Sequence, residues 1–230
     1  MIPRDIWSSG RPALHRLVLW RHGRTEWNAA GRAQGHADVS LDDVGRAQAV
    51  RTAPALASYS PAFVWSSDLA RARETAAALM ALIPAVELRL DSRLREYDVG
   101  IRQGLTFPEF AEKHPALYAD FTSCSATAIP GAESTEQVRQ RMTAVLTEAA
   151  DAVGPGETGV VVGHGAALRV GVLGFLGVPD RLGEILAGME NCAWAVLELR
   201  SGRGWQIVDY NSRTLPESVE LADDPVQARE

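Results

Sequence analysis

Two short apolar segments, far apart in the chain, constrain its fold most strongly. Residues 14–20 (LHRLVLW) and 158–163 (TGVVVG) are rich in branched apolar side chains. Such runs are typical of strands that are covered on both faces, as in parallel sheets. Between them, residues 40–57 begin with a Ser N-cap, and apolar residues recur at helical spacing from Val138 to Ala149. This alternation predicts an α/β fold, a three-layer αβα sandwich around a mainly parallel mixed sheet.

Further elements complete this sandwich. Residues 63–67 (FVWSS) predict a strand, and a helix is expected to follow from about residue 68 to 82. Residues 192–199 (CAWAVLEL) and 204–210 (GWQIVDY) alternate more clearly between apolar and polar side chains, and the turn-like RSGR joins them. These two segments predict a closing hairpin at the end of the sheet.

A single domain over residues 1–230 is the expected organisation. A chain of 230 residues with 46% hydrophobic content can bury one large core. Residues from about 98 to 133 interrupt the strand and helix alternation with prolines and scattered aromatic side chains, which predicts a small inserted cap over one end of the sheet. Residues 216–230 are acidic and nearly free of large apolar side chains, so we expect a loose tail.

Composition restricts the partners and the compartment. The formal net charge is -6 and the pI is near 5.4, which argues against nucleic acid or an anionic membrane as partner. Cys124 and Cys192 are too few for a disulfide framework, and no apolar run has the length of a signal peptide core or a membrane span. We therefore expect a cytoplasmic protein with a small-molecule partner. The apolar, partly β C-terminal region is compatible with a homodimer.

Two histidines share one setting at the ends of predicted strands. His22 follows LVLWR and precedes Gly23, and His164 follows GVVVG and precedes Gly165. In open α/β sheets, ligands bind at the carboxyl ends of the strands. A single histidine at such a place is more often half-buried without a chemical role. The matched pair favours a ligand site, and each glycine lets the backbone approach a ligand closely.

Arginines add positive charge to the same edge. Arg21 adjoins His22, and Arg71 follows a predicted strand at the start of a helix, whose N-terminus itself favours an anion. Guanidinium groups match phosphate and carboxylate geometry. Together these groups predict a pocket for a doubly charged oxyanion such as phosphate. The alternative for Arg71 and Arg73 is a solvated helix face that pairs with Glu74, which we prefer for Arg73.

The segment RHGRTEWN (21–28) resembles the signature of the histidine phosphatase superfamily, the phosphoglycerate mutase-like enzymes. The segments LDDVGRAQA, SSDLARARETA, RLREYDVGIRQG, PGAES and VVGHGAALR follow in the family's order, so the resemblance covers most of residues 16–170. A lone RHG would be a weak signal, whereas this ordered series is specific. The resemblance implies an αβα sandwich and a reaction through a phosphohistidine, with no metal and no other cofactor.

The same motifs imply roles for individual residues. His22 would be the nucleophile, and Arg21, Arg71 and His164 would hold the phosphoryl oxygens. Glu96, from RLRE, would protonate the leaving oxygen and then activate water. The substrate-binding residues implied by the resemblance are Arg21, Asn28, Gln34, Arg71, His164 and Gly165.

Several residues keep a second interpretation at this point. For Glu96 the alternative is an ion pair with Arg93 or Arg95. His36 is expected in a surface loop, with a place near the pocket mouth as the alternative, and Asn191 is interpreted as a buried polar residue at a strand entrance.

A phosphatase is favoured over a cofactor-dependent phosphoglycerate mutase. Such mutases carry a histidine and a tyrosine after the catalytic glutamate and a longer insertion, whereas here Glu96 is followed by YDVG and the insertion is moderate. The predicted function is a phosphomonoesterase, a histidine acid-type phosphatase. The mutase and a catalytically weak phosphate-ligand-binding regulatory protein stay open as alternatives.

The substrate is expected to be a small phosphorylated metabolite. The C-terminal third resembles actinobacterial members of the phosphatase branch, including those that act on glucosyl-3-phosphoglycerate, so a phosphoglycerate or glucosyl-phosphoglycerate type of substrate is implied. Arg24 and Arg102 are hypothesised to meet a substrate carboxylate. The aromatic residues of the insertion either pack the cap, which we prefer, or shape an organic pocket; they are Phe107, Phe110, Tyr118 and Phe121.

Overall fold

The sheet confirms the predicted mainly parallel topology. The computed structural model describes residues 14–123, 128–179, 182 and 185–214. Its strands are β1 (His15–Arg21), β2 (Phe63–Ser66), β3 (Leu88–Leu90), β4 (Thr158–Gly163), β5 (Trp194–Arg200) and β6 (Gly204–Ser212). The strand order is β3-β2-β4-β1-β5-β6. The first four strands pair in parallel, and β5 and β6 join antiparallel as the predicted hairpin.

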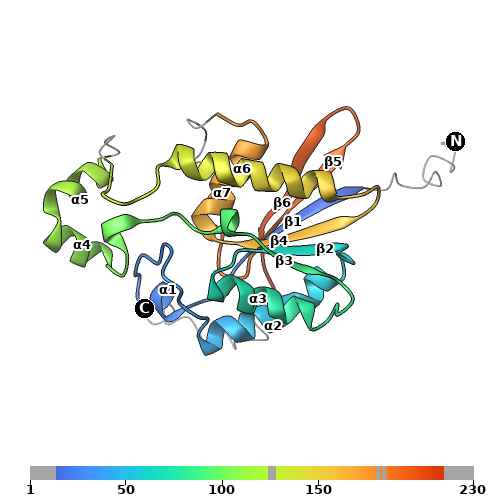
Figure 1. The fold of residues 1–230 in the computed structure, drawn as a ribbon, viewed down its shortest axis with the longest axis horizontal. Coiled ribbons are helices and arrows are strands. Elements are labelled where there is room, and N and C mark those ends of the chain that lie inside the picture. Colours follow the sequence, from blue (N-terminus) through green and yellow to red (C-terminus); the bar gives the residue numbers. More distant parts are fainter. Residues whose placement is uncertain (1–13, 124–127, 180–181, 183–184, 215–230) are drawn as a thin grey trace, which may run out of the picture.

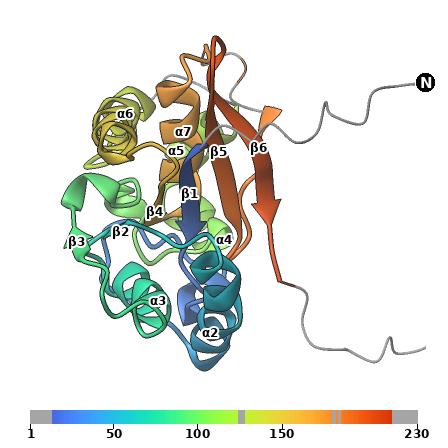
Figure 2. The same cartoon turned by 90° about the vertical axis from the view of Figure 1, so that its right-hand side faces the viewer.

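Helices cover both faces of this sheet. They are α1 (Glu26–Ala29), α2 (Asp43–Ala57), α3 (Ala70–Met80), α4 (Phe107–Lys113), α5 (Pro115–Thr122), α6 (Thr135–Ala152) and α7 (Gly165–Phe175), with short 3-10 turns η2 (Ser92–Leu94) and η3 (Gly100–Arg102). Figures 1 and 2 show α2 and α3 on one face and α6 and α7 on the other. The three-layer αβα sandwich is thus confirmed. No helix in the described ranges is long and apolar enough to span a bilayer.

The two sides of β1 belong to two separate cores. Leu17 and Leu19 pack with the apolar stripe of α6 and with α7, whereas Val18 and Trp20 pack with α2 and α3. All four side chains are at most 1% exposed. Successive strand residues point to opposite faces, so an uninterrupted apolar run is what a strand between two helical layers requires.

The N-terminus of α2 corrects one detail of the sequence analysis. The expected Ser N-cap at residue 40 is wrong, because Asp42 caps the helix and its Oδ1 accepts a hydrogen bond from the Gly45 amide at 2.7 Å. A carboxylate at this position satisfies a free N–H group and also interacts favourably with the helix dipole.

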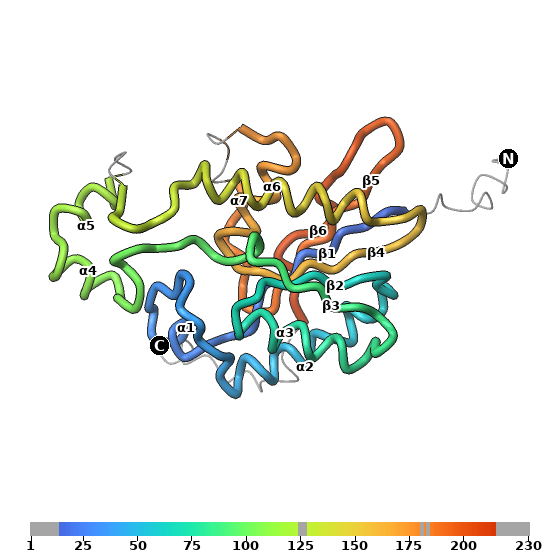
Figure 3. Tube along the Cα trace, viewed as in Figure 1, coloured from blue at the N-terminus to red at the C-terminus, as the bar shows by residue number. Residues whose placement is uncertain are grey.

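Between η3 and α6 the chain carries α4 and α5 outside the sandwich. Figure 3 shows the chain running out from the strand region to these two helices and returning to α6. An isolated antiparallel bridge between Val99 and Ala132 joins the outgoing and returning segments. Phe110 is 1% exposed and contacts the rings of Tyr118 and Phe121. These rings therefore pack α4 against α5, as we preferred, and Phe121 also lines the cavity described below, as the alternative had it. The domain and cap boundaries stay predictions, and the proposed tail lies outside the described residues.

The close approach of α2 to the loop after β1 supplies a test of this packing. A Cβ on Gly45 would lie 2.0 Å from the Arg24 carbonyl oxygen, so Gly45→Ala must push the loop away from the helix. We expect the free energy of unfolding to fall by about 1–3 kcal/mol, measured by urea denaturation. Gly188→Ala is the matched control, because nothing lies within 4 Å of its added Cβ. Equal urea midpoints for the two variants would contradict this packing.

Candidate active site

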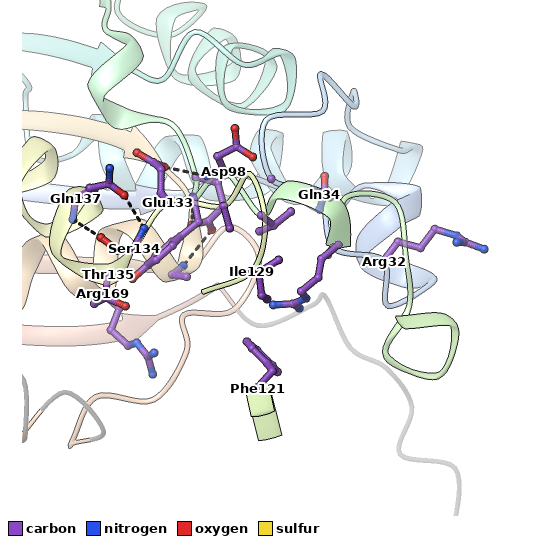
Figure 4. A pocket seen from close by; sticks show the side chains of 18 of the residues that line it. Arg32, Gln34, Asp98, Phe121, Ile129, Glu133, Ser134, Thr135, Gln137 and Arg169 are labelled. Atoms are coloured by element: carbon purple, nitrogen blue, oxygen red, sulfur yellow. Dashed lines mark hydrogen bonds between the residues drawn. The ribbon is translucent and has the colours of Figure 1, made fainter. Parts of the chain in front are cut away.

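A cavity of about 800 Å³ lies where β1 ends, and its size suits an organic phosphate. Arg21 and His22 line it from the end of β1, Arg71 from α3, and Ala166 from α7. Residues from the 98–133 segment form much of the remaining wall, and Figure 4 shows Asp98, Phe121, Ile129 and Glu133 among its labelled side chains. Residues of this segment and of the sheet edge therefore line one pocket.

His22 is held as a neutral imidazole. It is 3% exposed, and its Nδ1 lies 2.7 Å from the Gly23 carbonyl oxygen, so Nδ1 carries the proton and donates it. Burial, followed by the charges of Arg21 and Arg71, holds the pKa of His22 well below its ordinary value of 6.5. No hydrogen bond from a described residue engages Nε2. His22 therefore presents an unprotonated, nucleophilic nitrogen.

Two polar groups in the cavity wall lack partners. Arg21 donates through Nη1 to the Met189 carbonyl, but its Nε is buried without a hydrogen bond. The Gln34 side-chain oxygen is buried and equally unpaired. Burial lowers the pKa of Arg21, although the charges of Glu96 and Glu190 act in the opposite direction. Buried polar groups are normally paired, so two unpaired ones in the wall of the same cavity indicate a binding site for a polar ligand.

Arg71 is anchored to the backbone. It is 0% exposed, which contradicts the alternative of a solvated helix face. It donates to the carbonyl oxygens of Ala37 at 2.7 Å and Gly35 at 2.8 Å, and through Nε to His164 at 3.2 Å. These bonds use three of the five N–H groups of a guanidinium. Arg71 lines the cavity, so the remaining N–H groups can serve an anion there.

Arg73 and Glu74 do not form the expected pair. Glu74 instead bonds Arg46 of α2 at 3.1 Å, while Arg73 is exposed. Adjacent helix residues point about 100° apart around the helix axis, so a neighbour on α2 reaches Glu74 more easily. The predicted solvated position of Arg73 is confirmed, but not its predicted partner.

His164 lies directly behind His22. The two ring centroids are 5.1 Å apart, and His164 is fully buried. Its Nδ1 accepts from Arg71, so its proton lies on Nε2, which bonds the Ser67 hydroxyl at 2.9 Å. His164 and Gly165 are not among the residues that line the cavity, although a Cβ on Gly165 would lie 3.2 Å from the Arg21 Nε. The phosphate contact expected of both residues stays a prediction.

Asn28 and Asn191 form a bridge that the sequence analysis did not foresee. Asn191 donates to the His22 carbonyl at 3.2 Å and to the Asn28 Oδ1 at 3.3 Å. The Asn28 Oδ1 also accepts from the Thr25 amide, so its oxygen is occupied while the side chain lines the cavity. The position of Asn191 directly before a predicted strand was the one available signal. This strand is β5, and its antiparallel pairing with β1 places the residues that precede it beside His22.

Glu96 faces the same cavity from the segment that follows η2. Its Oε1 accepts from the Ala167 amide at 2.9 Å and its Oε2 from the Ala166 amide at 3.1 Å, at the start of α7. The alternative for Glu96 is wrong, because Arg95 bonds Asp68 and Arg93 bonds Asp91. The carboxylate is therefore free of arginine partners among the described residues, and the N-terminus of α7 fixes its position.

Arg141 holds the backbone around Glu96, a role that no local pattern in the sequence predicts. Its Nη2 donates to the Glu96 carbonyl at 2.9 Å and to the Glu133 carboxylate at 2.8 Å, and its Nη1 donates to the Arg95 carbonyl at 2.6 Å. His36 lies in a turn, is half-buried and approaches the same Glu96 carbonyl at 2.9 Å. It therefore combines the expected loop position with a place beside a residue of the pocket wall, although it does not itself line the cavity.

Arginine supplies the positive charge of the site. Among the described residues, five arginines and three carboxylates line the cavity. No group of three or more His, Cys, Asp or Glu side chains within the described ranges is arranged to hold a metal ion. The arrangement can therefore bind a phosphoryl group by guanidinium groups, beside a neutral imidazole and a fixed carboxylate.

Comparison with known proteins identifies the family. A model of the histidine phosphatase superfamily (branch 1) matches residues 17–213. The glucosyl-3-phosphoglycerate phosphatase of Mycolicibacterium vanbaalenii is 36% identical over 190 residues, which cover 80% of this chain and 84% of the relative. The metal-independent phosphoserine phosphatase of Arabidopsis thaliana is 42% identical over 156 residues, which cover 66% of this chain and 65% of the relative.

A solved structure agrees with these relatives. The mycobacterial glucosyl-3-phosphoglycerate phosphatase in complex with VO3 is 32% identical, with a TM-score of 0.77, and the match covers 86% of this chain and 99% of that one. Relatives named as probable phosphoglycerate mutase are more distant, at 29 to 32% identity. The chain therefore belongs to the histidine phosphatase superfamily, which confirms the resemblance of its motifs. The family and its relatives place it among phosphoric monoester hydrolases.

The lowered pKa values of His22 and His164 predict their titration. Both rings are fully buried beside arginines, so both are expected to stay neutral as the pH falls from 7.5 to 5.5. A group with the ordinary pKa of 6.5 would change from about 90% neutral to about 10% neutral over that range. Imidazole NMR of the wild type measures this, with His22→Ala and His164→Ala to assign the signals. A midpoint near 6.5 for either ring would contradict the prediction.

Proposed function

We propose that this protein hydrolyses the phosphate monoester of a small metabolite through a phosphohistidine on His22. One observation carries this proposal. The Gly23 carbonyl holds the proton of His22 on Nδ1, which leaves Nε2 as a nucleophile in the cavity that also contains the unpaired Nε of Arg21. A nucleophile beside an uncompensated cation is suited to attack on a phosphoryl group.

The first half-reaction forms the phosphoenzyme. The His22 Nε2 attacks phosphorus, and the bond between phosphorus and the ester oxygen breaks. Glu96 gives a proton to the leaving oxygen, so that an alcohol departs. Arg21 and Arg71 stabilise the charge on the phosphoryl oxygens, and their backbone bonds hold them in place before the substrate arrives.

The second half-reaction returns the enzyme to its starting state. Glu96, now a carboxylate, takes a proton from water, the water oxygen attacks phosphorus, and the bond from phosphorus to Nε2 breaks to release inorganic phosphate. His164 keeps Arg71 oriented through its Nδ1. A direct bond from the His164 Nε2 to a phosphoryl oxygen would replace its bond to the Ser67 hydroxyl.

A phosphoglycerate or glucosyl-phosphoglycerate type of substrate is supported by the names of the relatives. Glucosyl-3-phosphoglycerate and phosphoserine both carry a carboxylate besides the phosphate ester. The YDVG that follows Glu96 favours hydrolysis over mutase chemistry. The acid-type subclass is part of the proposal, because a nucleophile that stays neutral in acid remains active there.

Removal of the nucleophile tests the proposal. His22→Ala is expected to lower phosphate release from nitrophenyl phosphate and 3-phosphoglycerate by about a thousandfold or more. Intact-mass analysis of rapidly quenched wild type is expected to show one added phosphoryl group, and His22→Ala none. His15→Ala is the control, because this histidine begins β1 and does not line the cavity at the other end of that strand. Isomerisation of 3-phosphoglycerate without net release would make the protein a mutase, and silence in both assays would favour the regulatory alternative.

The acid role of Glu96 has a separate signature. Glu96→Ala is expected to slow the release of phosphate from an alkyl phosphate by about 100- to 10,000-fold, because an alkoxide leaves only with a proton. Nitrophenyl phosphate, whose leaving group needs no proton, should lose much less activity. Glu96→Gln is the matched variant that keeps the side-chain shape. An equal loss for both esters would show that Glu96 is not the general acid.

A further inference from the structure

We infer that Arg102 forms a second anion site in the cavity, which binds a carboxylate on the organic part of the substrate. This inference rests on the proposed phosphomonoesterase function and adds the feature by which the enzyme selects among esters. In the sequence, Arg24 and Arg102 were equal candidates for contact with a substrate carboxylate, and the structure favours Arg102. Arg24 bonds Asp42 at 2.8 Å and does not line this cavity, whereas Arg102 does.

The guanidinium of Arg102 is fixed in place by aromatic rings. Its central carbon lies 4.3 Å from the ring centroid of Phe121, 5.1 Å from that of Phe107 and 5.6 Å from that of Phe110. Contacts of this kind use the planar face of a guanidinium and leave the N–H groups at its edge available. Arg102 is thus oriented by contacts that do not occupy its hydrogen-bond donors.

Arg102 also lacks an acidic partner. Its side chain forms no hydrogen bond or ion pair with any described residue, although it is half-buried and the chain has more acidic than basic residues. Arg32, on the same side of the cavity, bonds Glu109 at 2.7 Å and is therefore neutralised. Burial lowers the pKa of Arg102 and no acid opposes this shift, whereas Glu96 and Glu190 oppose it for Arg21. A half-buried cation without a partner is costly unless a ligand supplies the anion.

The surroundings favour a carboxylate over a second phosphate. The phosphoryl group already has Arg21 and Arg71, Arg32 is paired with Glu109, and Arg169 donates to the Leu186 carbonyl at 3.5 Å. Arg102 is therefore the lining arginine whose side chain has no hydrogen bond to a described residue, and its single fork of donors matches a carboxylate in a bidentate manner. The cavity wall carries five arginines and three carboxylates, a formal excess of two positive charges. In Figure 4, Ile129 lies between Phe121 and the side of the pocket with Asp98 and Glu133.

Two esters that differ only at one carbon test the inference. 3-Phosphoglycerate carries a carboxylate where glycerol 3-phosphate carries a hydroxymethyl group. The wild type is expected to prefer 3-phosphoglycerate in kcat/KM by at least about tenfold, and Arg102→Met should lower kcat/KM for this ester by about 10- to 100-fold. For glycerol 3-phosphate the same variant should stay within about twofold of the wild type.

Matched variants separate recognition from folding. Arg102→Lys keeps the positive charge but not the planar fork of donors, so it should retain part of the preference for 3-phosphoglycerate. If Arg102→Met folds poorly, Arg102→Lys provides a second measurement of the same preference. Arg24→Met removes an arginine outside the cavity and should leave both kcat/KM values unchanged.

Each remaining outcome has a defined meaning. Equal losses on both esters in Arg102→Met and in Arg102→Lys would show that Arg102 only shapes the cap, and would overturn the inference. Equal use of both esters by the wild type would overturn it while the phosphomonoesterase function stands. Failure of the wild type to release phosphate from any ester, including nitrophenyl phosphate, would instead defeat the proposed function itself.

Discussion

The in-register parallel pairing of β1 with β4 is the constraint on which the site depends. Arg21 lies opposite Gly163, and the His22 amide donates to the Gly163 carbonyl at 3.0 Å. The next residue on each strand is a histidine, so the hydrogen bonds of the sheet themselves bring the two rings to a centroid distance of 5.1 Å. A shift of one residue would move these side chains to opposite faces of the sheet. Catalytic geometry therefore follows from strand register.

This arrangement concentrates positive charge in a buried place, which opposes folding when no anion is present. The pKa of Arg71 is lowered to about 10, chiefly by burial, although the carbonyl oxygens of Gly35 and Ala37 solvate its charge in place of water. Arg21 has one such carbonyl and an unpaired Nε. A phosphoryl group supplies the missing acceptors, so binding of the substrate and stability of the site are linked.

Local patterns in the sequence predicted the helices α2, α3 and α6 and every strand of the described sheet except β3, but they did not predict α1, α4, α5 or α7, nor the contacts that depend on tertiary structure. Branched apolar runs and helical spacing identified the sandwich, and the paired histidines located the sheet edge. Arg141 escaped notice because it lies 45 residues from Glu96 and acts on a backbone carbonyl, which no spacing rule reveals. Asn191 lies 169 residues from His22 and reaches it through the antiparallel pairing of β5 with β1. Likewise, no pattern shows that both ring nitrogens of His164 are occupied.

The two ends of the cavity are built by different physical means. The phosphoryl end uses the ends of strands and helices, whose positions are fixed by the sheet and by two buried cores. The opposite end uses a local aromatic cluster around Phe110 that packs α4 against α5 without contributing to either core. Changes in that cluster can alter the position of Arg102 while strand register, and with it the geometry of His22, stays the same. The chemistry proposed for His22 and the selectivity proposed for Arg102 are therefore separable, because different interactions hold the two side chains.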